Sequence, residues 1–147
     1  MEQRKNAQEM LFFLTLVCAL LTGCTTNTQD APPAKTVTTT FVSPTGIEEV
    51  SADEVSKNFE RYKQEYALVD VRETEEYAAG RIPGTVNIPL SVLKTGKDVA
   101  LDKSRAVLTV CNSGVRSIKA AQILKGKGYK VKSMEGGMNA WKGPTEK

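Results

Sequence analysis

The chain has 147 residues, 40% of them hydrophobic and 25% charged, which is enough for one compact domain of about 100–150 residues and a short extension. Its formal net charge of +3 is too small to indicate a nucleic-acid partner. It contains no histidine, which excludes the Cys-His and Ser-His pairs that activate many enzymatic nucleophiles.

The N-terminal segment has the pattern of a secretion signal. Its apolar run, residues 11–21, is shorter than the ~20 residues that span a bilayer and matches the core of a signal peptide, so we expect residues 1–23 to be removed on export. The run ends in Leu21-Thr22-Gly23-Cys24, which resembles the lipobox of bacterial lipoproteins. This resemblance implies a lipid anchor on Cys24 that holds the protein at a membrane surface. The alternative is an ordinary signal peptide that leaves Cys24 as a free thiol.

The residues after Cys24 bear on the location of the mature protein. Positions 25 and 26 are both threonine, and by resemblance the lack of an aspartate there favours the outer membrane in a bacterium with two membranes. We therefore expect an exported protein on the periplasmic or cell-surface side. Residues 24–46 are rich in Thr and Pro and predict a flexible tether, which leaves residues 47–147 for the folded domain.

Strands and helices alternate in the predicted domain, which favours a mostly parallel sheet with helices on both faces. Ligands of such sheets bind beyond the carboxyl ends of the strands. In chain order we predict a helix over 52–62, a strand over 67–71, and a helix over 75–79 that Thr74 caps and Gly80 ends in the αL conformation. Strands over 86–88 and 106–110 follow. After Cys111 we predict a helix that ends near Gly126, then a strand over 129–134 and a helical segment around Trp141; the helix after Cys111 has on one face Val115, Ile118, Ala121 and Leu124.

Cys111 is the most informative single residue because it lies between a buried strand and the start of a helix. Backbone N–H groups and the positive end of the helix dipole converge there and lower the pKa of a thiol from about 8.5 into roughly the 3.5–7.5 range. Cys18 would leave with the signal and Cys24 would carry lipid, so Cys111 is the free thiol of the mature chain. We therefore expect neither a disulfide nor a metal site, and no cofactor.

Four segments together resemble a single-domain rhodanese, a sulfurtransferase module, over about residues 47–145. The resemblance implies a three-layer α/β/α domain with a five-stranded sheet. It also implies that Cys111 takes sulfane sulfur from thiosulfate or a similar donor, holds it as a persulfide and passes it to a thiophilic, nucleophilic acceptor. The four segments are Leu68-Val69-Asp70-Val71-Arg72 with Glu75-Glu76-Tyr77, residues 80–89, residues 111–116, and residues 135–141.

The same resemblance assigns roles to the other candidate site residues. Arg72 pairs with Asp70 to brace the loop that residues 111–116 form. Arg81 stands where many relatives have histidine, and it lies either near the pocket at this loop or on the surface. Asn112 replaces a basic residue of several thiosulfate-using relatives, which leaves the donor open. The residues that line the loop are Asn112, Ser113, Gly114 and Val115, and Arg116 closes it with forked donors that fit an oxyanion.

Two other functions remain as alternatives. Tyrosine-phosphatase-like and cell-cycle phosphatase relatives place five residues between cysteine and arginine, whereas four separate Cys111 from Arg116, so phosphatase or arsenate reductase activity is disfavoured. A sulfur-carrier module with little turnover of its own fits the same residues. We expect a monomer.

Overall fold

The structure is a computed structural model, and it describes residues 41–42 and 44–147. The predicted signal peptide, Cys24 and most of the predicted tether lie outside the described residues. Within the described part, no helix combines the length and the apolar character needed to cross a membrane.

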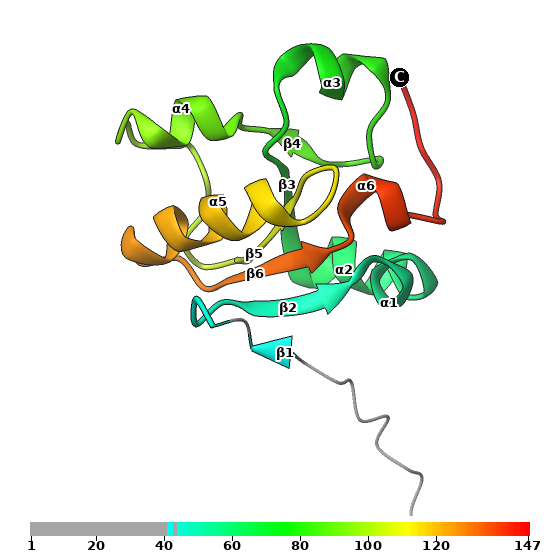
Figure 1. Cartoon of the computed structure of the whole chain (residues 1–147), viewed down its shortest axis with the longest axis horizontal. Coiled ribbons are helices and arrows are strands. Elements are labelled where there is room, and N and C mark those ends of the chain that lie inside the picture. The colour runs from blue at the N-terminus through cyan, green and yellow to red at the C-terminus, as the bar shows by residue number, and fades with distance from the viewer. Residues whose placement is uncertain (1–40, 43) are drawn as a thin grey trace, which may run out of the picture. The chain divides into compact units, whose positions relative to one another are not determined.

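Six strands form one sheet in the order β1-β2-β6-β5-β3-β4 (Figure 1). Strands β2 to β6 all pair in parallel, which confirms the predicted five-stranded parallel sheet. Strand β1 adds an antiparallel edge beside β2, although its residues were predicted to belong to the tether. The strands are β1 (Phe41–Val42), β2 (Glu48–Ser51), β3 (Tyr66–Asp70), β4 (Val86–Asn87), β5 (Ala106–Val110) and β6 (Val131–Glu135).

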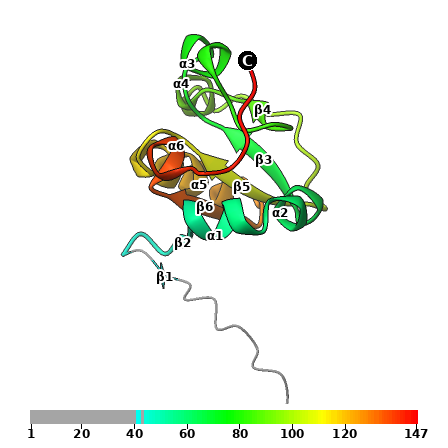
Figure 2. The ribbon, with the colours of Figure 1, turned by 90° about the vertical axis from the view of Figure 1, so that its right-hand side faces the viewer.

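Helices cover both faces of the sheet and so complete the three layers (Figure 2). Helices α1 (Ala52–Lys57) and α2 (Phe59–Glu65) pack on one face, where they bury Val55, Phe59 and Tyr62. Helices α4 (Leu90–Lys94) and α5 (Val115–Gly126) pack on the other face. The remaining helices are α3 (Thr74–Ala79) and α6 (Gly137–Ala140).

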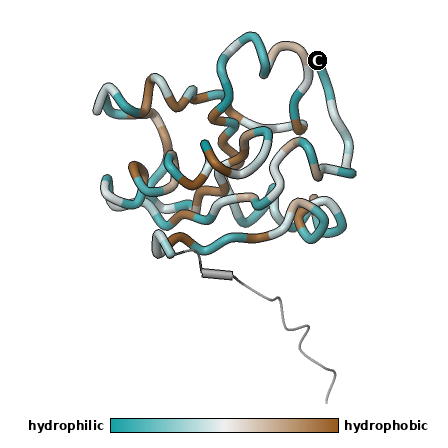
Figure 3. Tube along the Cα trace, in the orientation of Figure 1, coloured by the Kyte–Doolittle hydropathy of each residue, from teal (hydrophilic) through white to brown (hydrophobic). Residues whose placement is uncertain are grey.

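The central strands β3 and β5 contribute to the core on both faces of the sheet. Their last residues are buried, as expected for apolar strands that are covered on both faces. Figure 3 shows the hydrophobic residues gathered along these strands and the helix faces that contact them. The carboxyl ends of β3 and β5 lie side by side, because Asp70 pairs with Val110. The segment after each strand therefore begins at the same edge of the sheet.

The first predicted helix is wrong as a single element, because it breaks at Asn58 into α1 and α2. The Asn58 side-chain amide donates to the Glu54 carbonyl oxygen at 3.2 Å. An Asn side chain that bonds the main chain in this way competes with the regular helical pattern. The predicted spacing of apolar residues is nevertheless preserved, since Phe59 and Tyr62 are both buried.

Both predicted ends of α3 also need correction. Glu73, not Thr74, caps the helix, because its carboxylate accepts from the Glu76 amide while the Glu76 carboxylate accepts from the Glu73 amide. Gly80 has a φ of 164°, which is extended backbone, so the αL ending is wrong. The Gly80 N–H still closes the helix on the Tyr77 carbonyl oxygen at 3.3 Å.

The inner face of α5 differs from the prediction, because Val115 and Ile118 are not among its buried residues whereas Ser117 and Ala120 are. Val115 is 59% exposed, because the helix begins there and its side chain points away from the sheet. The buried face consists of Ser117, Ala120, Ala121 and Leu124. Strand β2 and helix α4 were not predicted, since each is a short element of four or five residues.

Candidate active site

Cys111 directly follows β5, and only 1% of its surface is exposed. Its main chain is fixed by the start of α6, where the Met138 amide donates to the Cys111 carbonyl oxygen at 2.8 Å. The Asn139 amide donates to the Asn112 carbonyl oxygen at 2.9 Å. The loop after Cys111 is thus held by the segment at residues 135–141, which the sequence had singled out separately.

Two glycines allow this close packing. Gly114 has a φ of +98°, and a Cβ atom there would lie 3.4 Å from the Gly136 nitrogen. Gly137 has a φ of +54°, and its Cβ would collide with the Cys111 carbonyl oxygen and the Asn112 carbonyl group. A larger residue at Gly137 would push the cysteine loop away from α6, whereas at Gly114 the positive φ is the constraint.

The Cys111 sulfur sits among hydrogen-bond donors at the N-terminus of α5. The Gly114 amide donates to Sγ at 3.1 Å and the Ser117 amide does so at 3.4 Å. Burial raises the pKa of the Cys111 thiol, but hydrogen bonds from the Ser117 side chain and from the amides of Ser117, Gly114 and Ser113 outweigh burial and lower the pKa. The site therefore favours a thiolate without a neighbouring base.

Two buried serines behind the sulfur were not predicted as site residues. The Ser117 Oγ lies 3.6 Å from Sγ, 2.7 Å from the Gly114 carbonyl oxygen and 2.9 Å from the Ser133 Oγ, so its hydroxyl is within hydrogen-bond reach of all three. Both serines are fully buried. The position of Ser117 in the first turn of α5 could have indicated its role, whereas Ser133 comes from β6 and gave no local signal.

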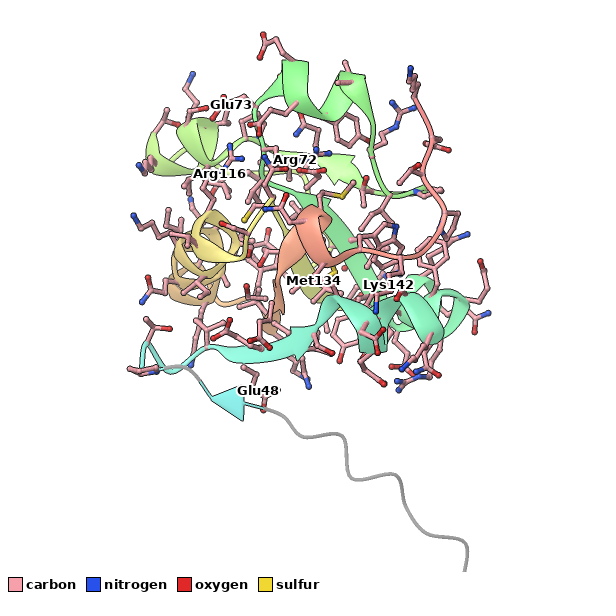
Figure 4. The ribbon with its side chains drawn as sticks, turned by 45° about the vertical axis from the view of Figure 1, so that its right-hand side comes forward. Glu48, Arg72, Glu73, Arg116, Met134 and Lys142 are labelled. Carbon is pink, nitrogen blue, oxygen red and sulfur yellow. The ribbon has the colours of Figure 1, made fainter. Side chains whose placement is uncertain are left out.

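Arg116 does not contact the sulfur through any hydrogen bond, because both terminal nitrogens bind Glu76. Nη1 donates to Oε2 at 2.6 Å and Nη2 donates to Oε1 at 2.7 Å. The forked donors predicted to hold an oxyanion thus hold a carboxylate of the same chain. Glu76 was quoted in a family segment but was not predicted as a site residue. Figure 4 shows Arg116 and Glu73, which caps α3, at the same end of the sheet.

Asn112 also turns to Glu76, since its Nδ2 donates to Oε1 at 2.7 Å. The Glu73 amide donates to Oε2 at 3.1 Å. Hydrogen bonds from Arg116, the largest cause, lower the pKa of Glu76 to about 2 against the effect of burial. The same contact raises the pKa of Arg116 above its ordinary value. The remaining predicted loop residues, Ser113 and Val115, are exposed.

Asp70 and Arg72 form the predicted ion pair, which is almost entirely buried. Arg72 Nη2 lies 2.7 Å from Asp70 Oδ2 and also donates to the Gly80 carbonyl oxygen at 2.7 Å. Arg72 Nε donates to both carboxylate oxygens at 3.0 Å. The pair therefore fixes the end of α3 relative to β3, and so places Glu76 opposite the cysteine loop.

Arg81 makes no hydrogen bond with residues 111–116, and its supporting role at the site stays a prediction. Its Nε donates to Glu146 at 3.0 Å, and its main chain pairs with the main chain of Glu146. Its guanidinium lies over the Tyr77 ring at 5.0 Å from the centroid. Arg81 thus holds the C-terminal segment, a contact that no motif indicated. Met138 and Trp141 pack against the core, as predicted.

These contacts create a buried sulfur that is surrounded by N–H donors. A cradle of main-chain amides stabilises an anion on sulfur whether that anion is a thiolate or a persulfide. Cys111 is therefore suited to act as a nucleophile and to hold a transferred group.

Known proteins resemble this chain in sequence and in fold. Residues 51–144 match the family described as the rhodanese-like domain. A Bacillus subtilis (strain 168) protein named "Putative sulfurtransferase YtwF" is 38% identical over 100 residues, covering 68% of this chain and 95% of that protein. Another protein of that strain, named "Putative sulfur carrier protein YrkF", is 40% identical over 80 residues, which cover 54% of this chain and only 43% of that protein.

Comparison with a solved structure supports the same family on the basis of the fold. The crystal structure of a rhodanese-related protein from Thermoplasma volcanium superposes with a TM-score of 0.59 at 29% identity, covering 67% of this chain and 96% of that one. The sheet order, the position of the cysteine loop after β5 and the match over residues 51–144 all indicate the same fold. The chain belongs to the rhodanese-like domain family.

Proposed function

We propose that this protein is a sulfurtransferase that carries sulfane sulfur as a persulfide on Cys111. The observation that carries the proposal is the hydrogen bonding of a buried sulfur by the Gly114 and Ser117 amides, in a chain without histidine. Family membership and a relative named as a sulfurtransferase support sulfur transfer as the class of activity.

The reaction divides into two balanced steps. In the first, the Cys111 thiolate attacks the outer sulfur of thiosulfate or a similar donor, a new S–S bond forms, and the S–S bond of the donor breaks. With thiosulfate, sulfite leaves with the bonding pair. In the second step, a nucleophilic acceptor attacks the terminal sulfur of the persulfide and the Cys111 thiolate leaves. The amides that stabilise the starting thiolate are in place to stabilise it again as a leaving group.

The test is turnover with thiosulfate or another sulfane donor and cyanide as the acceptor, measured as thiocyanate formation. The wild-type chain is expected to turn over, and Cys111→Ser is expected to be inactive. Thiocyanate formation by the serine variant at the wild-type rate would exclude Cys111 as the sulfur carrier. Hydrolysis of an aryl phosphate by the wild type would instead favour the phosphatase alternative.

A sulfur carrier is the second candidate, and the burial of Sγ together with the occupied Arg116 favours it. One relative is named as a sulfur carrier, although the match covers less than half of that protein. A carrier would load one sulfur per chain and then require a partner to remove it. Loading without thiocyanate formation would therefore identify this second function.

We also propose that the chain is exported and anchored by lipid on Cys24. The support is the apolar run at residues 11–21 followed by Leu21-Thr22-Gly23-Cys24. Labelling of cells with a radioactive fatty acid should mark the wild-type chain and leave Cys24→Ser unmarked. Equal labelling of both chains, or of neither, would contradict lipidation at this residue.

A further inference from the structure

Glu76 neutralises the cation of the cysteine loop. Among loop residues 111–116, Arg116 alone carries a positive charge, and both of its terminal nitrogens are bonded to the Glu76 carboxylate. The side chain of Asn112 bonds the same carboxylate. The one cation and the one side-chain amide of the loop are therefore both engaged by one of the protein's own acids.

The carboxylate is firmly held. It accepts four hydrogen bonds, two from Arg116, one from Asn112 and one from the Glu73 amide. The helix that carries it is fixed at its other end, where Arg72 donates to the Gly80 carbonyl oxygen. A competing anion would have to displace an acid whose hydrogen bonds are charge-assisted and whose helix is braced.

The acid also adds negative charge next to the cation of the loop. The carboxylates of Glu73 and Glu76 both lie at the first turn of α3. The hydrogen bonds that Arg116 donates to Glu76 are the main cause of its raised pKa, and the charges of both carboxylates raise this pKa further. A thiosulfate dianion that approaches the Cys111 thiolate therefore meets like charge and no unoccupied cation of the loop. A hydropersulfide of a small thiol, R–S–S–H, has no oxyanion that would need one.

We propose that Glu76 determines donor specificity, and that its contact with Arg116 makes the protein prefer small hydropersulfides over thiosulfate. The inference rests on the proposed function, since it requires a persulfide on Cys111. With this donor the Cys111 thiolate attacks the terminal sulfur, the S–S bond of the donor breaks, and an alkyl thiolate leaves with the bonding pair. The proton stays on the transferred sulfur, so charge and atoms balance and no oxidant is required.

Loading of Cys111 in a single turnover tests the proposal. The probes are sodium thiosulfate and 2-hydroxyethyl hydropersulfide generated in solution, and the readout is the mass of the Cys111 peptide after rapid quenching. Each rate constant is divided by that of the same donor with a free small thiolate, which removes intrinsic reactivity. In the wild type the normalised rate constant should favour the hydropersulfide by about tenfold or more, as expected for one uncompensated charge at close range.

The informative variant is Glu76→Gln, which keeps the size of the side chain and a residue type that capping boxes accept. It should shift the ratio of thiosulfate to hydropersulfide loading towards thiosulfate by about tenfold, because Arg116 loses its charged partner. Glu75→Gln is the matched control. It removes the same charge from the same turn of α3, but its side chain is exposed and makes no hydrogen bond or ion pair with the described residues, so its ratio should stay at the wild-type value.

The outcomes separate the two proposals. If neither donor loads the wild-type Cys111, the proposed function fails. If both donors load but Glu76→Gln leaves their ratio unchanged, only the role of Glu76 fails. The wild-type ratio is informative even if the glutamine variant does not fold, because a normalised preference for thiosulfate would overturn the inference without any variant.

Discussion

Arg116 and Glu76 are 40 residues apart in the chain and meet through two hydrogen bonds, at 2.6 and 2.7 Å. Their side chains are each 32% exposed, so the pair is partly screened by water. The contact joins the start of α5 to the first turn of α3. It thereby connects the stability of the loop to the ionisation of one acid.

Acid should weaken the fold through Glu76. Its pKa is lowered from 4.5 to about 2 in the folded chain, mainly by Arg116. The stabilisation is therefore complete above the unfolded pKa and is lost as the pH falls from about 4.5 towards 2. Glu76→Gln should lower the free energy of unfolding at neutral pH by about 1 kcal/mol, after allowance for exposure, and flatten its pH dependence in that window. Urea denaturation at a series of pH values measures both effects.

The control for this prediction is Glu75→Gln, which should keep the wild-type slope between pH 5 and pH 2. An unchanged slope in Glu76→Gln would mean that Arg116 does not stabilise the carboxylate in solution.

Loss of the Ser117 hydroxyl should raise the pKa of Cys111. The Ser117 side chain is the largest of the hydrogen-bond contributions that hold this pKa below its ordinary value against burial. The pH profile of alkylation by iodoacetamide should therefore move to higher pH in Ser117→Ala. Ser113→Ala is the control, because that side chain is exposed and only its amide acts on the sulfur. A profile that coincides with that of the wild type would remove Ser117 from the thiolate site.

Gly137→Ala should destabilise the protein by more than the higher helix propensity of alanine can offset. A Cβ there would collide with the Cys111 and Asn112 main chain, and the backbone has positive φ. We expect a loss of about 1–3 kcal/mol in the free energy of unfolding. Gly126→Ala has nothing within 4 Å of its Cβ and should be neutral or slightly stabilising. Similar melting temperatures for the two variants would contradict close packing of α6 on the loop.

Asp70→Asn should be strongly destabilising. The substitution leaves the buried Arg72 guanidinium without its carboxylate, and removal of one partner from a buried pair costs about 3–5 kcal/mol. Asp53→Asn serves as the comparison, since Asp53 pairs with Lys57 and Lys142 at the exposed surface and its loss should change little. Chemical denaturation measures both. Equal stabilities of the two variants would show that the Asp70 pair does not brace α3.

The sequence predicted those features that depend on local pattern. Alternating strands and helices gave the parallel sheet, and the apolar run before Cys111 gave β5 and the position of the cysteine. The pairing of Asp70 with Arg72 was implied by the family resemblance, and the two residues lie two positions apart in the chain. Each of these features involves residues within one element or its two neighbours.

Contacts between distant segments could not be predicted in the same way. The Glu76 contact with Arg116 and the Ser133 contact with Ser117 join residues 40 and 16 positions apart, and no periodicity specifies them. Arg81 is a further example, because its contact with Glu146 joins residues 65 positions apart. Helix ends were also hard to assign, since Glu73 caps α3 with a carboxylate where the adjacent threonine is the more usual cap.

The mass of the Cys111 peptide after exposure to a sulfane donor tests the central proposal most directly. In the wild-type chain we expect a gain of one sulfur atom on this peptide, reversed by cyanide with formation of thiocyanate, and no gain on the corresponding peptide of Cys111→Ser. Absence of the adduct from the wild type with both thiosulfate and a hydropersulfide would contradict a persulfide on Cys111, and so would an adduct of equal yield in the serine variant.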